Sequence, residues 1–276
     1  MTQVRVVDVW GGMGDALLAT PALRALKRDH PDVEIRVRCK ENTLEILEHN
    51  PHVDVLSCHP DDPRFRDLPV TDTNYGKRYP SVLCQRRASE LIAELVGVTL
   101  EDGRLVVALT EADEQKALNI VAGHRNPLSL HVTSGSLSYK NWPVDRWEQL
   151  VRRLPECTFI QLGDDRDPPV ALTVDVRGMT TPREAIAVVK HTKGFVGVDS
   201  FLNHATNAVG TPGVVLFGPS APAIWGHPQN TNLYAGVECS PCVDTIGKNP
   251  CPWGHRCMTA ISVDEVERAV RTTLLI

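Results

Sequence analysis

Two polar residues, Asp199 and Ser200, stand between a strongly apolar stretch and a short helical pattern. Residues 195–198 predict a buried strand and residues 202–209 a helix, and a second apolar stretch follows at 214–217. Strand, helix and strand make a parallel β-α-β unit, in which ligands bind where strands end and helices begin. Free amide groups and the helix dipole at Ser200 would hold a phosphate or diphosphate there. The alternative is that both residues only cap the helix.

A second phosphate cradle is indicated by small residues that follow another strand. Residues 129–132 predict the strand, and Thr133, Ser134, Gly135 and Ser136 come directly after it. Backbone N–H groups in such a turn can surround an anion. Lys140 follows a few residues later. A single surface lysine ordinarily stays solvated, so only this neighbourhood makes Lys140 a candidate.

A glycine-rich turn, residues 11–15 (GGMGD), lies between a strand predicted at 4–10 and a helix predicted at 16–28. Such a turn lets the backbone approach a ligand closely. A dinucleotide-binding fingerprint would need a third glycine at Leu17 and an acidic residue where Arg38 stands. We therefore discount NAD as a ligand, with NADP as a remote alternative.

These turns are positioned by an alternation of helices and strands that predicts an α/β protein. The segment 57–80 is rich in Pro, Asp and Arg and shows no periodicity, so we expect a functional or disordered loop there. The break at 125–127 (RNP) is typical of a linker between domains. The other predicted helices are 44–48, 88–96, 111–123, 144–154, 182–190 and 263–274, and the other predicted strands are 33–38, 53–56 and 158–162.

Length and charge limit the function classes. The 276 residues suffice for one large or two small domains. A net charge of −5, from 29 basic and 34 acidic residues, offers no general attraction for nucleic acid, so no nucleic-acid partner is expected. No apolar stretch approaches the roughly 20 residues of a membrane span, and no signal peptide is visible. We expect a cytoplasmic protein, with peripheral attachment to the inner membrane as an open alternative.

Four of the eight cysteines are clustered near the C-terminus. Cys239, Cys242, Cys251 and Cys257 have the spacing C-x2-C-x8-C-x5-C. Four thiolates at such a spacing suit tetrahedral zinc or iron, whereas unligated thiols are the alternative. With all four positions filled by protein, such a metal would be structural, and we expect no catalytic metal.

Six segments, in order along the chain, resemble glycosyltransferase family 9, the heptosyltransferases of lipopolysaccharide core assembly. The resemblance implies a GT-B fold, in which two Rossmann-like domains with parallel sheets face a central cleft. Residues 1–125 would form a shortened acceptor-side domain, and residues 126–276 a nucleotide-sugar domain with the Cys-rich segment 239–257 and a C-terminal helix. The matching segments are 11–37, 50–56 (NPHVDVL), 132–147 (VTSGSLSYKNWPVDRW), 161–167 (QLGDDRD), 198–222 (VDSFLNHATNAVGTPGVVLFGPSAP) and 239–258.

The resemblance also implies an inverting glycosyltransferase that moves a sugar, with heptose from ADP-heptose favoured, to an acceptor hydroxyl. Asp15 matches the catalytic aspartate, and a carboxylate there could take the acceptor's proton; otherwise it is an acid favoured by the helix dipole. Lys140 matches the lysine at the donor phosphates. We expect Asp199 to turn back as a helix cap. The other implied donor residues are Ser134, Gly135, Asp167, Ser200, Phe201, Leu202 and His204, and the implied acceptor-side loop is Gly12, Met13 and Gly14.

Three departures from the family pattern bear on the substrates. Phe201 stands where the family usually has glycine, at the closest approach of backbone to phosphate. Asp167 occupies the place of an acidic residue, usually glutamate, that holds the donor ribose, and its side chain is one methylene shorter than that of glutamate. The acceptor-side half is also short for the family. The acceptor could be a glycan, a lipid-linked sugar or a protein, and the sequence leaves the oligomeric state open.

Two other functions stay open on the sequence alone. A sugar-nucleotide epimerase of GT-B type would need no separate acceptor. A catalytically inactive sugar-nucleotide-binding or assembly protein would explain Phe201 and the short first half.

Overall fold

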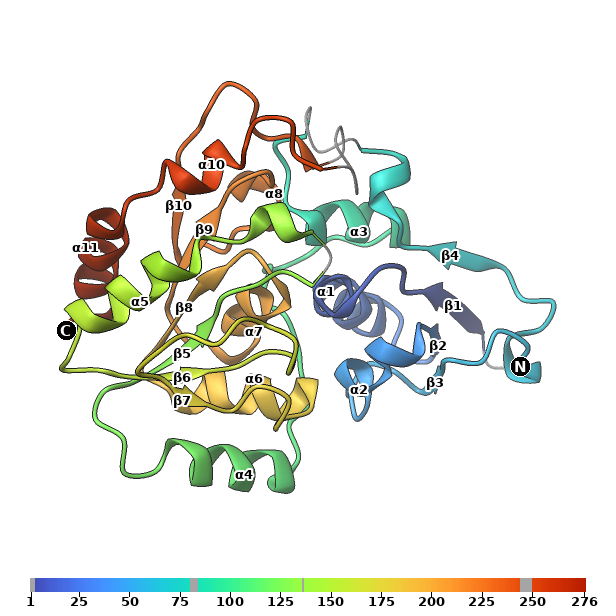
Figure 1. Ribbon diagram of the computed structural model, residues 1–276. Helices are drawn as coiled ribbons and strands as arrows, with labels where there is room; N and C mark the ends of the chain where they lie inside the picture. The colour runs from blue at the N-terminus through green and yellow to red at the C-terminus, as the bar shows by residue number, and fades with distance from the viewer. Residues whose placement is uncertain (1–2, 80–83, 136, 244–249) are drawn as a thin grey trace.

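The first sheet contains four parallel strands. The computed structural model describes residues 3–79, 84–135, 137–243 and 250–276. β1 (Val4–Asp8) lies between β2 (Glu34–Arg38) and β4 (Val70–Asp72), and β3 (Val55–Ser57) pairs with the outer side of β2. Among the described residues, three α-helices belong to this unit, at the right in Figure 1: α1 (Met13–Asp29), α2 (Leu44–Leu47) and α3 (Ala88–Val96).

The second sheet has six parallel strands in the order β10-β9-β8-β5-β6-β7. β8 (Gly194–Val198) and β9 (Gly213–Phe217) are buried at every position, as expected for central strands covered on both faces. The sheet is completed by β5 (Pro127–His131), β6 (Thr158–Gln161), β7 (Val174–Asp175) and β10 (Thr231–Tyr234).

Helices cover both faces of this second sheet (Figure 1). α6 and α11 begin with capping boxes, in which Thr181 and Ser262 each accept a hydrogen bond from a backbone N–H of the first turn. α7 ends at Gly210 in the left-handed conformation that glycine adopts readily. The helices are α5 (Val144–Arg153), α6 (Pro182–His191), α7 (Phe201–Val209), α8 (Pro222–Trp225), α10 (Arg256–Thr259) and α11 (Val263–Leu274).

α4 (Glu111–Val121) packs on the second unit, although the sequence suggested a boundary at residue 125. Its main neighbour is α6, and Arg183 of α6 donates to Asp113 of α4 over 2.6 Å. The chain therefore crosses between the units before α4, where Leu105 N donates to Asn207 Oδ1 of α7. The break at 125–127 joins α4 to β5 within the second unit, so it is not the crossing point. The division at residue 125 stays a prediction, and this packing favours an earlier boundary.

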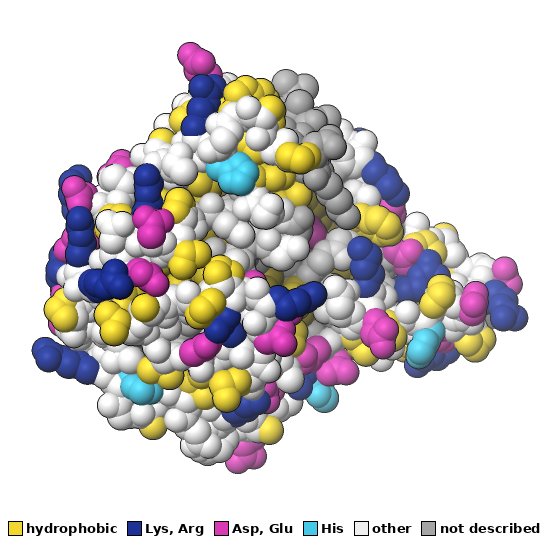
Figure 2. All heavy atoms as spheres, viewed as in Figure 1, with side chains coloured by type: hydrophobic (Ala, Val, Ile, Leu, Met, Phe, Trp, Pro, Cys, Tyr) yellow, Lys and Arg dark blue, Asp and Glu magenta, His cyan; other side chains and the backbone are white. Residues whose placement is uncertain are grey.

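One apolar core runs through both units. α1 packs against α7, and the buried side chains of Leu17, Leu202 and Ala205 belong to one continuous cluster. A second cluster, with Trp142, Trp147 and Met258, fills the other face of the second sheet. The predicted α/β fold with two parallel sheets is thus confirmed. On the face shown in Figure 2, basic and acidic side chains are interspersed, so this face carries no field of one sign.

The irregular segment predicted at 57–80 is partly regular. Residues 70–72 form β4 at the edge of the first sheet, and a 3₁₀ turn (Tyr75–Lys77) follows it. The strand is only three residues long and is largely exposed, so it carries almost no hydrophobic periodicity. This is why the sequence pattern missed it.

Candidate functional site

The carboxyl ends of the two sheets face each other across the junction of α1 and α7. β1 leads into the Gly11–Asp15 turn, whereas β5, β6 and β8 lead into the turns at 133–135, 163–167 and 199–200. A cavity of about 810 Å³ lies where these turns meet. Its walls include Met13 from the first unit, Thr133, Gly135 and Asp167 from the second, and Phe201 and Leu202 at the start of α7. Open α/β sheets bind ligands at such a crevice.

Asp15 is a half-buried carboxylate in the first turn of α1. Its Oδ2 accepts a hydrogen bond of 2.9 Å from Gly12 N, and its Oδ1 accepts one of 3.3 Å from the Tyr75 hydroxyl. Burial raises the pKa of Asp15 above its usual 3.8, and the Gly12 amide, Tyr75 and the Lys140 ammonium oppose this shift. A carboxylate with a raised pKa is a stronger base than a solvated one.

A hydrogen-bonded chain joins Asp15 to the second unit. Trp225 Nε1 donates to the Tyr75 hydroxyl over 2.9 Å, and the hydroxyl in turn donates to Asp15. Burial and the neighbouring Asp15 charge raise the pKa of Tyr75 well above 10, so this hydroxyl keeps its proton. The chain fixes the orientation of the carboxylate and ties it to α8.

Lys140 and Asp199 form a buried ion pair in the second unit. Lys140 Nζ lies 2.8 Å from Asp199 Oδ2, which also accepts a hydrogen bond of 2.6 Å from Ser220 Oγ. Burial alone would raise the pKa of Asp199, but the Lys140 ammonium beside it holds that pKa below 3.8. Lys140 Nζ also lies 5.9 Å from the centre of the Trp225 ring. These contacts hold Lys140 beside Asp15 across the junction.

Asp199 does not cap α7, contrary to the expectation from sequence. Ser200 takes the N-cap position, and its side chain accepts no hydrogen bond from the first turn of the helix. The carboxylate is directed instead to Lys140, Ser220 and, over 3.4 Å, Asn203 Nδ2. The lysine attracts it more strongly than a neutral amide would. The amides at the start of α7 are therefore left for a ligand.

His131 is buried at the base of the cavity, and the sequence analysis did not single it out. Its Nδ1 lies 2.7 Å from Ser200 Oγ, and its Nε2 lies 3.9 Å from Asp167 Oδ2. Burial lowers the pKa of His131 to about 4, although the Asp167 charge opposes the shift. The ring is thus neutral at pH 7 and links the two residues predicted to hold diphosphate and ribose. Its place at the end of β5, next to Thr133, was the signal available in the sequence.

His204 faces the first unit rather than the cavity. Its Nδ1 lies 2.9 Å from His227 Nε2, and burial lowers its pKa to about 4. The other edge of the His204 ring packs against Gly14 of α1: a Cβ at Gly14 would lie 2.9 Å from His204 Cδ2. The ring thus packs between α7 and α1, and the predicted contact of His204 with donor or acceptor stays a prediction.

Replacement of Gly14 by alanine should push α1 away from α7. Overpacking of this kind costs about 1–3 kcal/mol of unfolding free energy, and Asp15 would move with the helix, so transfer should also fall. Gly12→Ala is the matched control, because a Cβ there meets no atom within 4 Å. Chemical denaturation and initial rates of both variants test this. Equal effects of the two substitutions would show that the contact with His204 does not matter.

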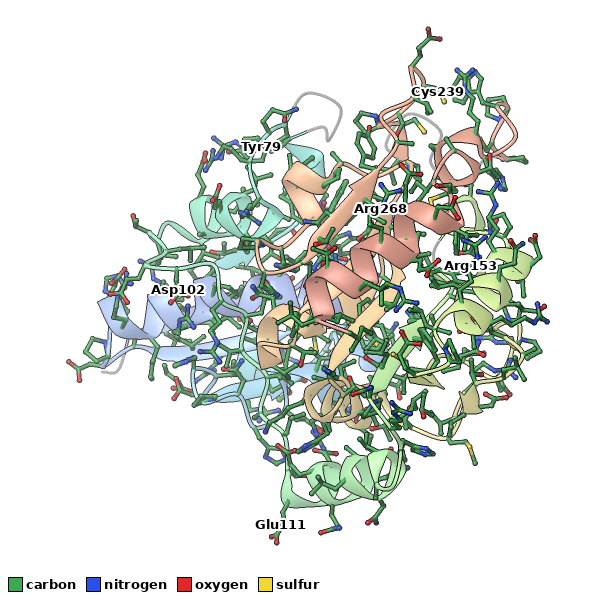
Figure 3. All side chains as sticks on the ribbon, turned by 90° about the vertical axis from the view of Figure 1, so that its left-hand side faces the viewer. Tyr79, Asp102, Glu111, Arg153, Cys239 and Arg268 are labelled. Carbon is green, nitrogen blue, oxygen red and sulfur yellow. The ribbon has the colours of Figure 1, made fainter. Side chains whose placement is uncertain are left out.

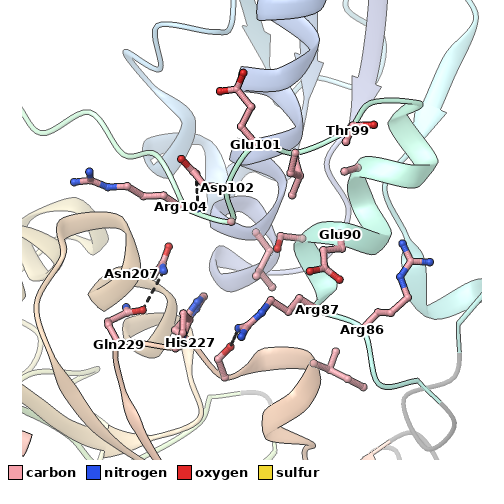
Figure 4. A pocket seen from close by; sticks show the side chains of 18 of the residues that line it. Arg86, Arg87, Glu90, Thr99, Glu101, Asp102, Arg104, Asn207, His227 and Gln229 are labelled. Carbon is pink, nitrogen blue, oxygen red and sulfur yellow. Dashed lines mark hydrogen bonds between the residues drawn. The ribbon is translucent and has the colours of Figure 1, made fainter.

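A second cavity, of about 930 Å³, lies at the opposite end of α7. Its lining includes Asn207 of that helix and Gly210 just after its end, and it also reaches α3 and the segment 224–229 (Figure 4). Arg87 donates to the Gly226 carbonyl over 2.7 Å within it. This cavity lies away from the turns that follow the strands, and its charged side chains are of both signs. We therefore place the chemistry in the first cavity.

The four clustered cysteines are free thiols near one another. Burial raises the pKa of the Cys242 thiol to about 11, and the neighbouring thiols of Cys257, Cys239 and Cys251 add to this shift. Figure 3 shows Cys239 at the periphery of the second unit, and residues 244–249 of the segment lie outside the described residues. Within the described ranges, no three His, Cys, Asp or Glu side chains are arranged to hold a metal ion. Thiolates are suitable ligands for zinc or iron, but the described thiols are not grouped as a metal-binding set. The metal site therefore stays a prediction.

The remaining predicted residues lie around the first cavity. Ser134 is buried, and its N–H donates to Asn141 Oδ1 over 2.9 Å. Asp167 lines the cavity and accepts from Asp164 N over 2.9 Å. Gly135, Phe201 and Leu202 also line this cavity, and the contact of the predicted residues with a donor stays a prediction. Tyr75 and Trp225 join the site without a signal in the sequence, because Tyr75 is 60 residues from Asp15 and Trp225 is 150 residues from Tyr75.

Comparisons with known proteins agree with this fold. Residues 166–251 match the model of glycosyltransferase family 9 (heptosyltransferase). The chain is 22% identical to lipopolysaccharide heptosyltransferase 3 of Escherichia coli, over 80% of this chain and 84% of that one. The crystal structure of a family 9 glycosyltransferase from Veillonella parvula superposes with a TM-score of 0.77 at 17% identity, covering 99% and 97% of the two chains. TibC of enterotoxigenic E. coli, an iron-containing dodecameric heptosyltransferase solved with ADP-D-β-D-heptose, superposes with a TM-score of 0.73 at 16% identity, covering 98% of this chain and 76% of that one.

Among the described residues, no helix has both the length and the apolar character of a membrane span.

Proposed function

We propose that this chain, a heptosyltransferase-like glycosyltransferase, transfers a heptose from ADP-heptose to an acceptor hydroxyl with inversion at the anomeric carbon. The observation that carries the proposal is the juxtaposition of Asp15 and Lys140. One lies on the first unit and the other on the second. Trp225 connects them, because its Nε1 donates to the Tyr75 hydroxyl that bonds Asp15, and its ring centre lies 5.9 Å from Lys140 Nζ. A base and a diphosphate-binding cation on opposite walls of one crevice are what transfer requires.

Asp15 acts as the general base. The acceptor oxygen attacks the anomeric carbon, its proton passes to Asp15, and the bond from that carbon to the diphosphate oxygen breaks. Attack from the first unit and departure toward the second are opposed, which gives inversion. The Tyr75 hydroxyl holds the carboxylate in place but keeps its own proton.

The second unit binds the donor. The nucleoside occupies the cavity of about 810 Å³, with the ribose at Asp167 and the diphosphate at the free amides of Ser200, Phe201 and Leu202. Lys140 neutralises the charge that develops on the leaving diphosphate. The Asp199 charge is offset by Lys140 and Ser220, so it does not repel the donor strongly.

The departures from the family pattern fit this placement. Phe201 packs partly against the apolar core, and its ring lies edge-on to His131 at 6.2 Å. It therefore forms a wall of the cavity without closing it. Asp167 lies at the cavity surface, where a shorter acid can still reach a ribose hydroxyl.

A thermal-shift series with ADP, UDP, GDP and adenosine tests the donor site. We expect ADP to give the largest shift, because it is the nucleotide of the proposed donor. A ligand at 100 times its dissociation constant stabilises the folded state by about 2.7 kcal/mol. Asp167→Asn should reduce the shift. Asp165→Asn is the matched control, since that exposed carboxylate does not line the cavity. No shift with any nucleotide would refute the proposal.

Product analysis with ADP-heptose alone separates the two other functions. An epimerase would return an isomerised nucleotide sugar, whereas a transferase gives slow hydrolysis at most. Donor binding with no turnover over a broad acceptor panel would indicate an inactive binding protein. The placement of Asp15 beside Lys140 favours transfer over both.

A further inference from the structure

We propose that the second cavity, at the junction of the two units, is an effector site for a small organic anion held by Arg87 and His227. The ligand carries a carboxylate or phosphate group on an apolar body. Its binding does not depend on the proposed function, whereas its effect on transfer rests on that function. The volume of about 930 Å³ lies within the range of small-molecule pockets.

Both units supply walls of the second cavity. The first unit contributes Leu18 of α1 and Ala93 of α3, residues 98–104 come from the segment that crosses between the units, and the second unit contributes Asn207 and Ile224. The apolar walls suit the body of an organic ligand. No described residue lines both this cavity and the first one. A ligand here therefore contacts both sides of the junction without competing with the donor for space.

Arg87 is the cation that would hold the anionic group. It directly precedes α3, is half-buried, and extends toward the segment that bears His227 (Figure 4). One of its N–H groups donates to the Gly226 carbonyl over 2.7 Å, and no described carboxylate forms an ion pair with it. A guanidinium has five N–H donors, so several remain for a ligand. Their planar arrangement matches a carboxylate or a phosphate.

The acidic side chains of the lining leave the charge of Arg87 uncompensated. Three of the four are already paired with other arginines: Glu94 with Arg86, Asp102 with Arg24, and Glu101 with Arg28. The fourth, Glu90, is exposed, so water and salt screen its charge. An anion is therefore the ligand that Arg87 favours.

His227 presents a second polar group to the same cavity. Only 5% of its surface is exposed, and its Nε2 lies 2.9 Å from His204 Nδ1, whereas its Nδ1 forms no hydrogen bond with a described residue. Burial lowers the pKa of His227 to about 2, and the charges of His204 and Arg87 add to this shift. The ring is therefore neutral at pH 7, with one nitrogen that donates and one that accepts. A bound anion would accept from Nδ1–H.

Occupation of the site would set the tautomers of two rings. When His227 donates to the anion from Nδ1, its Nε2 must accept from His204 Nδ1–H, because each neutral ring has a single N–H. His204 Nε2 is then unprotonated. That nitrogen faces the start of α1, since a Cβ at Gly14 would lie 3.4 Å from it, and Gly14 directly precedes Asp15. The ligand thus acts on the contact between α7 and α1 that positions the base.

The binding test follows the ring-nitrogen NMR signals of the full chain labelled with isotopic histidine. ADP is present throughout, so that added anions do not report on the donor site. The chain has ten histidines, and the His227→Gln variant identifies the signals of His227. Benzoate and phenyl phosphate are titrated separately, with benzamide as the neutral ring and acetate and inorganic phosphate as anions without an apolar body. We expect the two ring anions to shift the His227 signals at concentrations about tenfold lower than benzamide.

Arg87→Gln should weaken the binding of benzoate and phenyl phosphate about tenfold. Arg86→Gln is the matched control, because that adjacent residue lines the same cavity but is paired with Glu94 at 2.6 Å. Its affinity should equal that of the wild type. Equal losses in both variants, equal binding of benzamide, or His227 signals that do not respond would overturn the proposal. The ADP thermal shift of each variant shows that it is folded.

The effect on transfer is measured with ADP-heptose at saturating benzoate or phenyl phosphate. The initial rate should change in the wild type and in Arg86→Gln but not in Arg87→Gln. A wild-type rate that stays constant while the His227 signals shift would overturn the effector role. Absence of transfer by the wild type without any added anion would instead count against the proposed function.

Discussion

Asp15→Asn should reduce sugar transfer by a factor of about 10²–10⁴, the usual contribution of a positioned general base. Asparagine keeps the shape of the side chain: its Oδ1 can accept the Gly12 amide while its Nδ2 donates to the Tyr75 oxygen. Nucleotide binding should therefore survive, as calorimetry with ADP would show. The rate is measured with ADP-heptose and the best acceptor found. Full activity of this variant would remove Asp15 from its role.

The same substitution should stabilise the fold at neutral pH. Because burial raises the pKa of Asp15, its ionised form is disfavoured in the folded state relative to the unfolded one. This penalty is present at pH 7 and disappears as the pH falls below the unfolded value near 3.8. The unfolding free energy of Asp15→Asn should thus exceed that of the wild type at pH 7, and the difference should close toward pH 4. Activity of the wild type should rise with pH through the raised pKa.

Lys140→Met should weaken both the fold and the donor site. It leaves the Asp199 carboxylate buried without its cation, and breaking such a pair costs about 3–5 kcal/mol. It also removes the charge that stabilises the leaving diphosphate, so transfer should fall by a factor of about 10²–10³. Denaturant titration and single-turnover kinetics measure the two effects.

The double variant Lys140→Met/Asp199→Asn separates stability from chemistry. With the buried charge removed, most of the unfolding free energy should return, because a neutral amide can still bond Ser220 and Asn203. Transfer should remain as low as in Lys140→Met. A double variant that recovers both would mean that Lys140 serves only to neutralise Asp199.

The sequence predicted most of the fold because its strong elements are locally encoded. β8 and β9 are continuous apolar stretches, and α1 carries leucines at helical spacing, so periodicity alone located them. β4 and β7 have three and two residues, too few to show a period. The packing of α4 on the second unit depends on Arg183 and other long-range partners, which no local pattern records.

The candidate site was predictable only where a turn has its own signature. The Gly11–Asp15 and Asp199–Ser200 turns stand at strand ends, and the structure places both at the crevice. The partners of Asp199 were not predictable, because one strand separates it from Ser220 and three strands separate it from Lys140. Tyr75 and Trp225 are 150 residues apart, so their hydrogen bond exists only in the assembled fold.

The continuous core through α1 and α7 has a consequence for how the protein folds and unfolds. A chain cut before α4 would leave the face of α1 that bears Leu17 and Leu23 in water on one fragment, and that of α7 on the other. Each unit contributes apolar side chains to the core of the other, so both must be synthesised before either folds stably. Thermal unfolding of the two units should therefore be a single cooperative transition. The separation between Asp15 and the phosphate site is set by the packing of α1 on α7 rather than by a flexible linker.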